Sequence, residues 1–280
     1  MEFVKLNNGV EMPVLGYGVY QTPADITERC VAEALAIGYR SIDTAQAYGN
    51  EEGVGAAVKK SGIPRDEIFL TTKVWISNAG EEKAAASIDA SLKKLQTDYI
   101  DLLLIHQPFS DYYGTYRAME KAYRAGKLRA IGISNFYPDR FIDLQNFCDV
   151  KPAVNQIETH LFDQQKTAHA YLEKYHCAHE AWAPLGEGRT ELFTHPVVTE
   201  IASAHEKTNA QIALRFLLQS GVIVIPKSVH KERMQENFDV FDFTLSDEEM
   251  GKLQALDTTN SSFFSHYDPK TVEQFMEWAK

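Results

Sequence analysis

The sequence predicts a (β/α)8 barrel that spans residues 1–280 as a single domain, and three observations lead to that prediction. Short apolar runs rich in β-branched residues alternate with amphipathic stretches, which indicates crossover units and a parallel sheet. Eight such runs fall within about 250 residues, a size at which a barrel remains one domain. The run from Leu102 to Ile105 has no polar alternation, as expected for a strand covered on both faces.

The predicted elements follow one another at regular intervals. Strands are expected at residues 14–19, 40–43, 68–73, 99–106, 130–134, 153–158, 179–183 and 222–226. Helices are expected at residues 26–37, 51–60, 81–95, 113–125, 163–175, 199–205 and 210–220. In the first of these helices, Ile26, Cys30, Ala34 and Ile37 fall on one face, and this face is expected to pack against the sheet.

Two segments lie outside this alternation. The opening residues, with a turn at Asn8-Gly9, are expected to form a β-hairpin. The tail at 261–280 is expected to end in a short amphipathic helix. A doubly wound dinucleotide-binding fold is the main alternative, and it needs a G-x-G-x-x-G turn at the start of a helix. Gly16 and Gly18 are present but the third glycine is absent, so the barrel is favoured.

Composition narrows the class of protein. The 280-residue chain has a net charge of -11, which argues against nucleic-acid or anionic-membrane partners. No apolar run approaches the roughly 20 residues of a membrane helix, and no secretory signal opens the chain, so a cytoplasmic protein is expected. Three widely separated cysteines indicate neither a disulfide framework nor a metal site. A compact enzyme is the leading interpretation.

Polar residues end several of the predicted strands. These positions are Asp43, Lys73, His106, Ser134-Asn135, Asn155-Gln156 and Lys227-Ser228. In a parallel barrel such positions meet at the carboxyl-terminal mouth, where catalytic groups gather. Any one of them alone is more simply a side chain leaving the core. Their convergence from separate strands therefore predicts an active site.

Several ordered motifs resemble the aldo-keto reductase family. They are the segments DTAQAYGNE at 43–51, GIPR at 62–65, IGISNF at 131–136 and IPKS at 225–228. The similarity runs from the opening hairpin into the tail. The segment AWAPLG at 181–186 is most similar to the bacterial small-carbonyl and 2,5-diketogluconate-type reductases. The resemblance implies an oxidoreductase that reduces carbonyl groups on a TIM barrel. Because family members are often monomers, it also implies a monomer.

The family's catalytic tetrad matches Asp43, Tyr48, Lys73 and His106 without substitution. The resemblance implies that Tyr48 gives a proton to the carbonyl oxygen while His106 orients that oxygen. Lys73, paired with Asp43, is expected to lower the pKa of the Tyr48 phenol from its usual value of about 10. Taken singly, the same residues also fit a loop aromatic, a buried ion pair and a structural histidine.

The resemblance also implies an extended NADPH or NADP site across the mouth, with NADPH preferred over NADH. Ser134, Asn135 and Gln156 are expected to bind the nicotinamide carboxamide, and Trp182 to stack on its ring. The full predicted cofactor set is Gly18, Val19, Asp43, Ser134, Asn135, Gln156, Trp182, Pro184, Leu185, Glu187, Lys227, Ser228, Val229, Arg233, Glu236 and Asn237.

Three parts of that set have distinct expected partners. Pro184 and Leu185 are expected to cover the pyrophosphate, although the following loop at 187–189 departs from well-known eukaryotic members. Lys227 and Arg233 resemble a clamp for the adenosine 2′-phosphate, with Ser228 as a further donor. Glu236 and Asn237 are expected at the adenine. A solvated helix start is the alternative for the residues from 227 to 237.

The predicted substrate pocket contains Tyr20, Tyr48, Trp75, His106 and Gln107. Gln107 stands where a tryptophan often follows the catalytic histidine, which favours small aldehydes, dicarbonyls or keto-sugars over bulky aromatic substrates. Two alternatives from other classes stay open. One is a regulatory subunit that senses the cofactor, and the other is an aldolase that forms a Schiff base on Lys73, which would need a largely deprotonated amine.

Overall fold

A computed structural model describes residues 1–279 and shows a closed barrel of eight parallel strands. The strands, in hydrogen-bonded order, are β10 (Ile223–Val224), β9 (Ala178–Trp182), β8 (Val154–Glu158), β7 (Leu128–Ser134), β6 (Ile100–Ile105), β5 (Phe69–Val74), β4 (Ser41–Asp43) and β3 (Tyr17–Gly18). A parallel bridge between Leu15 and Val224 joins the two ends of this sheet, and the Gly16 N–H donates to the Val224 carbonyl at 2.8 Å. The predicted (β/α)8 barrel is confirmed.

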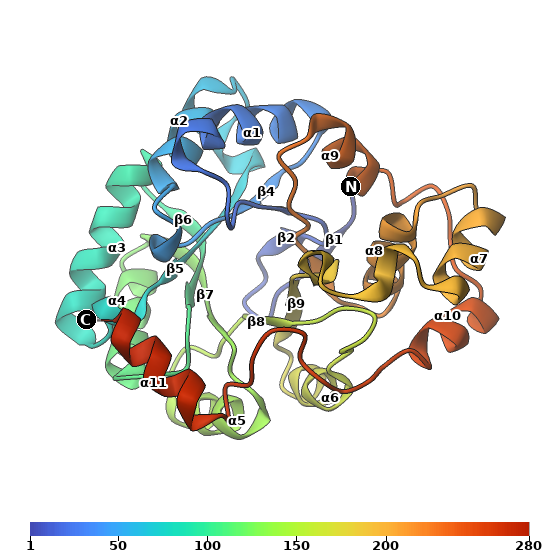
Figure 1. Cartoon of the computed structure of the whole chain (residues 1–280). Coiled ribbons are helices and arrows are strands. Elements are labelled where there is room, and N and C mark those ends of the chain that lie inside the picture. Colours follow the sequence, from blue (N-terminus) through green and yellow to red (C-terminus); the bar gives the residue numbers. More distant parts are fainter. Residues whose placement is uncertain (280) are drawn as a thin grey trace.

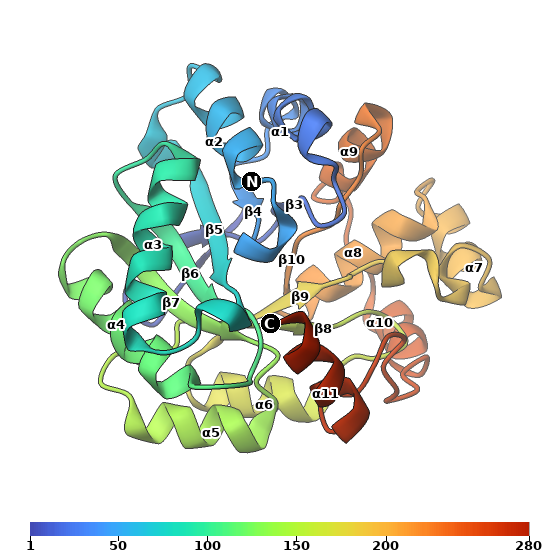
Figure 2. The ribbon, with the colours of Figure 1, turned by 60° about the vertical axis from the view of Figure 1, so that its left-hand side comes forward.

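Helices form a ring around these strands (Figures 1 and 2). They are α1 (Ala24–Ile37), α2 (Glu51–Lys60), α3 (Glu81–Leu95), α4 (Tyr112–Arg124), α5 (Pro138–Phe147), α6 (Lys166–Lys174), α7 (Pro196–Ala204), α8 (Asn209–Gln219), α9 (Lys231–Phe238), α10 (Asp247–Gln254) and α11 (Pro269–Trp278). The sequence prediction lacked α5 and α10. The second of these begins with a capping box between Ser246 and Glu249, a local signal that was available in the sequence.

The predicted hairpin and tail helix are both present. Strands β1 (Phe3–Lys5) and β2 (Glu11–Pro13) pair antiparallel. Leu6 and Met12 of this hairpin are buried in a hydrophobic cluster with apolar side chains of the barrel strands. The hairpin thus covers the amino-terminal end of the strands. In Figure 1, α11 lies at the lower left of the molecule, near α4 and α5. Lys280, the last residue of the predicted tail, lies outside the described residues.

The described part of the chain also contains five short 3₁₀ turns, and the first of them carries a predicted catalytic residue. They are η1 (Gln46–Tyr48), η2 (Arg65–Glu67), η3 (Ile76–Asn78), η4 (Gly186–Gly188) and η5 (Glu191–Phe193). Within residues 1–279, no helix combines the length and the apolar character needed to cross a membrane.

The loop around η1 is held by a buried asparagine. The Asn50 amide donates to the carbonyl oxygens of Val19 at 3.0 Å and Thr22 at 3.2 Å, and its Oδ1 accepts from the Thr44 hydroxyl at 2.8 Å. Three segments that reach the barrel mouth are therefore tied together by one side chain. Since backbone carbonyls in the interior need donors, asparagine at this position follows from the local geometry.

We expect Asn50→Ala to lower the free energy of unfolding by about 3 kcal/mol, because two carbonyls and a hydroxyl lose their buried partner. Urea denaturation followed by circular dichroism measures this change. Asn146→Ala, which alters an exposed asparagine on α5, is the control and should change stability little. Equal stability of the two variants would contradict the proposed role of Asn50.

Candidate active site

The predicted tetrad comes together at the carboxyl-terminal ends of β4, β5 and β6. Lys73 is fully buried on β5, and its ammonium donates to Asp43 Oδ1 at 2.5 Å and to the Thr44 carbonyl at 3.0 Å. It also reaches the Tyr48 hydroxyl at 3.4 Å. Asp43 on β4 aligns with Thr71 on β5, two residues before Lys73. The two neighbouring parallel strands therefore bring Asp43 and Lys73 together. One buried cation therefore contacts both a carboxylate and a phenol.

His106 completes this group at the end of β6. Its ring lies edge-on to Tyr48, with 5.6 Å between the ring centroids, and edge-on to Trp75 at 5.1 Å. Burial, with Lys73 and His266 nearby, holds the pKa of His106 well below its ordinary value. The imidazole is therefore neutral at physiological pH, and one ring nitrogen carries a hydrogen that can be donated to a carbonyl oxygen.

The electrostatics of Lys73 and Tyr48 differ in one respect from the expectation. Burial alone would lower the pKa of Lys73, but Asp43, Tyr48 and Glu180 together raise it above its ordinary value. Burial raises the pKa of Tyr48 to about 12, while the Lys73 ammonium acts in the opposite direction. The expected influence of Lys73 is present, but the expected net lowering for Tyr48 is wrong, because desolvation of the phenolate is the larger effect.

The three residues predicted to bind a carboxamide lie side by side across β7 and β8. Ser134 aligns with Gln156 in the sheet, and its hydroxyl donates to the Gln156 carbonyl at 2.7 Å. Asn135 has a left-handed backbone, with φ 65°, which asparagine tolerates well. Its Oδ1 accepts from the Trp182 indole N–H at 2.8 Å. Trp182, which is predicted to stack on the nicotinamide ring, is therefore hydrogen-bonded to Asn135, one of the residues predicted to bind the carboxamide.

Glu180 is a buried residue of this site that the sequence analysis missed. The Gln156 Nε2 donates to Asp43 Oδ2 and to Glu180 Oε2, both at 2.9 Å. Glu180 is fully buried, and its Oε1 has no hydrogen-bond partner among the described residues. Burial and the nearby Asp43 carboxylate raise the pKa of Glu180 to about 8. The protonated form therefore predominates at neutral pH.

The predicted cofactor residues of β3 and β10 lie at the seam where the barrel closes. A Cβ at Gly18 would meet the Ile225 carbonyl oxygen at 2.9 Å, so barrel closure alone already requires a glycine. Val19 is fully buried, and its N–H donates to the Asp43 carbonyl at 3.0 Å. Lys227 is exposed and donates to the Gln21 carbonyl at 3.3 Å, next to this seam.

The predicted 2′-phosphate segment continues into α9. Ser228 is buried, and its hydroxyl accepts from the His230 N–H at 3.1 Å, while Val229 is half-buried. Arg233 is exposed and makes none of the ion pairs found within residues 1–279. Glu236 accepts from Thr208 at 2.8 Å, and Asn237 is buried. The helix start is therefore present in this segment, and the clamp for a 2′-phosphate stays a prediction.

The loop after β9 carries the predicted pyrophosphate contacts. Pro184 is buried and Leu185 half-buried, while Glu187 is exposed on η4 with a left-handed backbone, φ 49°. The Arg189 guanidinium lies over the Phe263 ring at 4.5 Å and 4.0 Å from the Glu187 carboxylate. The loop is therefore in contact with the tail segment that follows α10.

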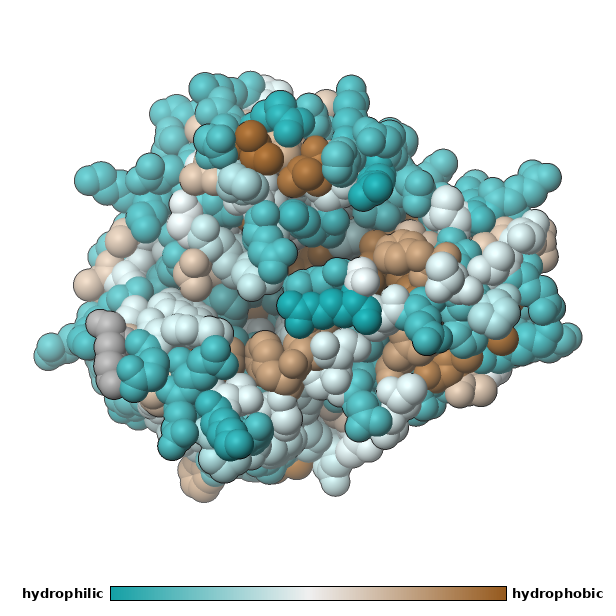
Figure 3. All heavy atoms as spheres, in the orientation of Figure 1, coloured by the Kyte–Doolittle hydropathy of each residue, from teal (hydrophilic) through white to brown (hydrophobic). Residues whose placement is uncertain are grey.

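The predicted substrate residues surround the same mouth. Tyr20 is exposed, and its ring lies 5.0 Å from that of Tyr48. Trp75 packs 6.2 Å from the Phe275 ring of α11, so the tail helix forms one wall. Gln107 is buried, and its Oε1 lies 2.8 Å from His266 Nε2. The face seen in Figure 3 is hollowed near its centre.

Glu158 is a second residue that the sequence analysis missed. It is fully buried at the end of β8, and it accepts from the Ser261 hydroxyl at 2.6 Å and the Ser262 N–H at 2.8 Å. His160 Nε2 lies 3.2 Å from the same carboxylate. Glu158 therefore anchors the tail segment to the barrel two residues beyond Gln156.

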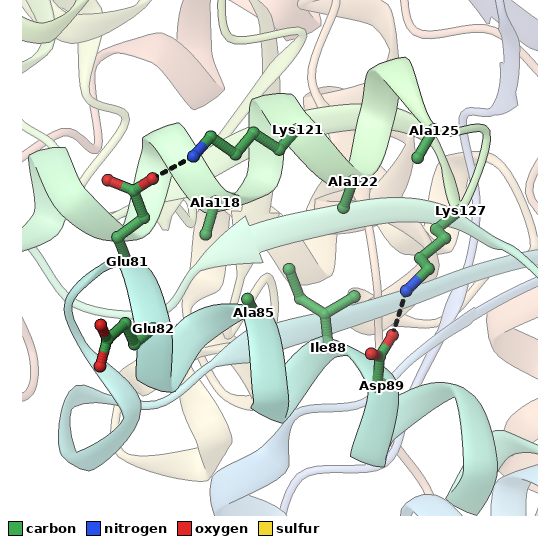
Figure 4. A pocket seen from close by; sticks show the side chains of 10 residues that line it. All are labelled: Glu81, Glu82, Ala85, Ile88, Asp89, Ala118, Lys121, Ala122, Ala125 and Lys127. Carbon is green, nitrogen blue, oxygen red and sulfur yellow. Dashed lines mark hydrogen bonds and ion pairs between the residues drawn. The ribbon is translucent and has the colours of Figure 1, made fainter.

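A second hollow of about 670 Å³ lies on the outer wall of the barrel, between α3 and α4 (Figure 4). Its floor includes Ile88 and Ala118, and the Asp89–Lys127 ion pair lies along one side. It shares no residue with the tetrad. Among residues 1–279, no group of three or more His, Cys, Asp or Glu side chains is arranged to hold a metal ion.

Comparison with known proteins identifies the family. Residues 14–258 match the model of the Aldo/keto reductase family. The chain belongs to the aldo-keto reductases. It is 48% identical over 255 residues to a glyoxal reductase of Bacillus subtilis (strain 168), a match that covers 90% of this chain and 92% of that protein. The family resemblance and the oxidoreductase class predicted from the motifs are confirmed.

Solved structures agree with this assignment. An aldo/keto reductase from Brucella melitensis is 46% identical and superposes with a TM-score of 0.89, covering 91% of this chain and 99% of that one. A Bombyx mori aldo-keto reductase solved in complex with NADP is 31% identical, with a TM-score of 0.91, covering 97% and 96%. The barrel of this aldo-keto reductase is therefore that of its family.

The protonation of Glu180 predicts how stability depends on pH. Its pKa is about 8 in the folded protein against an ordinary 4.5, so the folded state retains a proton that the unfolded state loses. The contribution of Glu180 to stability is therefore complete below about pH 4.5 and declines as the pH rises through 8. Glu180→Gln, which does not titrate, should gain stability over the wild type across this range, by a few kcal/mol.

Chemical denaturation at several pH values between 5 and 9, with roughly one-unit spacing, measures this difference. Glu52→Gln removes an exposed carboxylate on α2 and serves as the control, with a difference that should stay nearly constant. A flat difference for Glu180→Gln as well would show that Glu180 is ionised in the folded protein.

Proposed function

We propose that this aldo-keto reductase uses NADPH to reduce small aldehydes and dicarbonyl compounds to alcohols. The observation that carries the proposal is the contact of Lys73 with both Asp43 and Tyr48, beside a neutral His106. The similarity to a glyoxal reductase supports the substrate class. The NADP complex of the Bombyx mori relative supports the cofactor.

The residues at the mouth fit a nicotinamide dinucleotide. The Gln156 Oε1 accepts no hydrogen bond from residues 1–279 and is free to accept from a carboxamide N–H. The Trp182 indole is half-buried and fixed by Asn135, which suits it to support a flat ring. Lys227 and Arg233 supply positive charge for a phosphate. When bound, NADPH supplies the hydride that reduces the carbonyl carbon.

The side chains of the tetrad handle the proton and the developing charge. With a pKa of about 12, Tyr48 is protonated at neutral pH and holds the proton that the carbonyl oxygen needs. As that proton leaves, the Lys73 ammonium, 3.4 Å away, stabilises the phenolate. His106 donates a hydrogen bond to the same oxygen, and Asp43 keeps the lysine charged and oriented. In alcohol oxidation Tyr48 accepts the proton instead.

The structure disfavours an aldolase that uses Lys73. A Schiff base requires an unprotonated amine, but the pKa of Lys73 is raised above its ordinary value beside Asp43. The ammonium also donates to the Thr44 carbonyl and is fully buried, out of reach of a carbonyl carbon in solution. A regulatory subunit that only senses the cofactor would not need the contacts that join Asp43, Lys73 and Tyr48, so the complete tetrad favours an enzyme.

Tyr48→Phe should lower kcat for carbonyl reduction by at least about 100-fold, because the proton donor is lost. NADPH affinity should change by less than about threefold, since the ring and its packing remain. Loss of absorbance by NADPH with glyoxal or a small aldehyde measures the first quantity, and fluorescence titration the second. Tyr171→Phe is the control, because it removes an exposed phenol on α6 outside the predicted site. Near-normal turnover in Tyr48→Phe would contradict the mechanism.

Lys227→Ala combined with Arg233→Ala should weaken NADPH binding on the order of 100-fold and NADH binding only slightly, because two charged contacts to the 2′-phosphate are lost. Dissociation constants for both cofactors test this. Lys83→Ala with Arg124→Ala removes the same charge from exposed positions on α3 and α4 and controls for net charge. Equal losses for the two cofactors would assign this segment to a solvated helix start instead.

A further inference from the structure

A buried carboxyl group lies directly beneath the proposed carboxamide site and has no part in the proton transfer described above. Glu180 is 0% exposed on β9, opposite Gln156 in the sheet register, and it faces the barrel interior with Asp43. Its Oε2 accepts a single hydrogen bond, and its Oε1 has no partner in residues 1–279. An apolar side chain would avoid the cost of burying this group, so its presence calls for a reason.

The geometry of the Gln156 amide supplies that reason. Its single nitrogen donates one hydrogen to Asp43 and the other to Glu180, each at 2.9 Å. With one acceptor, either of the two N–H groups can face Asp43, and the position of Oε1 differs between the two arrangements. Two acceptors on different strands engage both N–H groups and fix the plane of the amide. Because the amide is also tethered to β8 through Cγ, Oε1 then has a single position. Asp43 and Glu180 together therefore fix the direction of the Gln156 oxygen.

We propose that Glu180 is a positioning residue that orients the Gln156 amide so that its Oε1 accepts from the carboxamide N–H of the bound nicotinamide. This inference rests on the proposed function, because it concerns the same cofactor site. It adds a residue whose only side-chain hydrogen bond within residues 1–279 is to Gln156, and which would position the cofactor through that amide. The charged groups that face Glu180 are Asp43 and Lys73, and both belong to the tetrad.

The test compares two reduced cofactors that differ at one group. One is NADPH, and the other is its analogue with an acetyl group in place of the carboxamide, which cannot donate to Gln156. Fluorescence titration gives the dissociation constant of each, and 2′-phospho-ADP-ribose, which lacks the nicotinamide ring, reports the remainder of the site. The wild type should prefer NADPH over the analogue by about tenfold, the contribution of one hydrogen bond.

Glu180→Met removes the acceptor from a side chain of similar length, and Glu180→Gln keeps an acceptor and serves as the matched variant. In Glu180→Met the preference for NADPH should fall to about threefold or less, while the affinity for 2′-phospho-ADP-ribose stays unchanged. In Glu180→Gln the tenfold preference should remain. Glu180→Val, which suits a strand, replaces the methionine variant if that one does not fold.

Each outcome has a distinct meaning. Equal preference in the wild type and Glu180→Met overturns the positioning role and shows that Glu180 affects only the packing of the barrel. Loss of preference in Glu180→Gln as well as Glu180→Met also overturns it, because an acceptor alone would then be insufficient. If the wild type does not bind NADPH, or binds NADPH and the analogue equally, the proposed cofactor site itself is wrong.

Discussion

The buried ammonium of Lys73 is the constraint on which the rest of the site depends. A charge with no solvent exposure is strongly destabilising unless hydrogen-bonded partners surround it. Asp43 at 2.5 Å and the Thr44 carbonyl at 3.0 Å meet that requirement, and the Tyr48 hydroxyl takes the third position. The contact between Lys73 and Tyr48, which helps to stabilise the buried lysine, is therefore also the contact that would stabilise a phenolate in the proposed proton transfer.

Barrel geometry explains why these groups meet. β4 and β5 are adjacent and parallel, so residues at their carboxyl ends lie within side-chain reach of each other. Closure between Leu15 and Val224 places β3 and β10 in contact, which brings Gly18 and Lys227 to the same rim. Away from the mouth, the buried Asp101 carboxylate forms ion pairs with Arg65 at 2.7 Å and with Arg129 at 2.6 Å. Arg65 is the last residue of the GIPR motif, so this part of the motif has a structural role.

Local patterns and ordered motifs in the sequence were sufficient to predict the barrel and its family, although helices α5 and α10 were missed. Alternation of apolar runs predicted the barrel, and the polar ends of those runs predicted Asp43, Lys73 and His106. The sequence was insufficient to predict the role of Glu180. His179 and Glu180 are adjacent and both buried, and only the register with Gln156 shows which of them faces the predicted cofactor site. Contacts across long separations, such as Glu158 with Ser261, leave no local signal at all.

The same long-range contacts link the parts of the mouth to one another. Phe263 packs edge-on against Trp182, with 5.1 Å between ring centroids, and its other partner is Arg189 of the loop after β9. The segment is anchored just before Phe263 by Glu158, on the strand that carries Gln156. The predicted stacking residue, the predicted pyrophosphate loop and the tail thus share one set of contacts. A displacement of any one of them would change the packing of the other two, so the predicted cofactor and substrate sites are not independent surfaces.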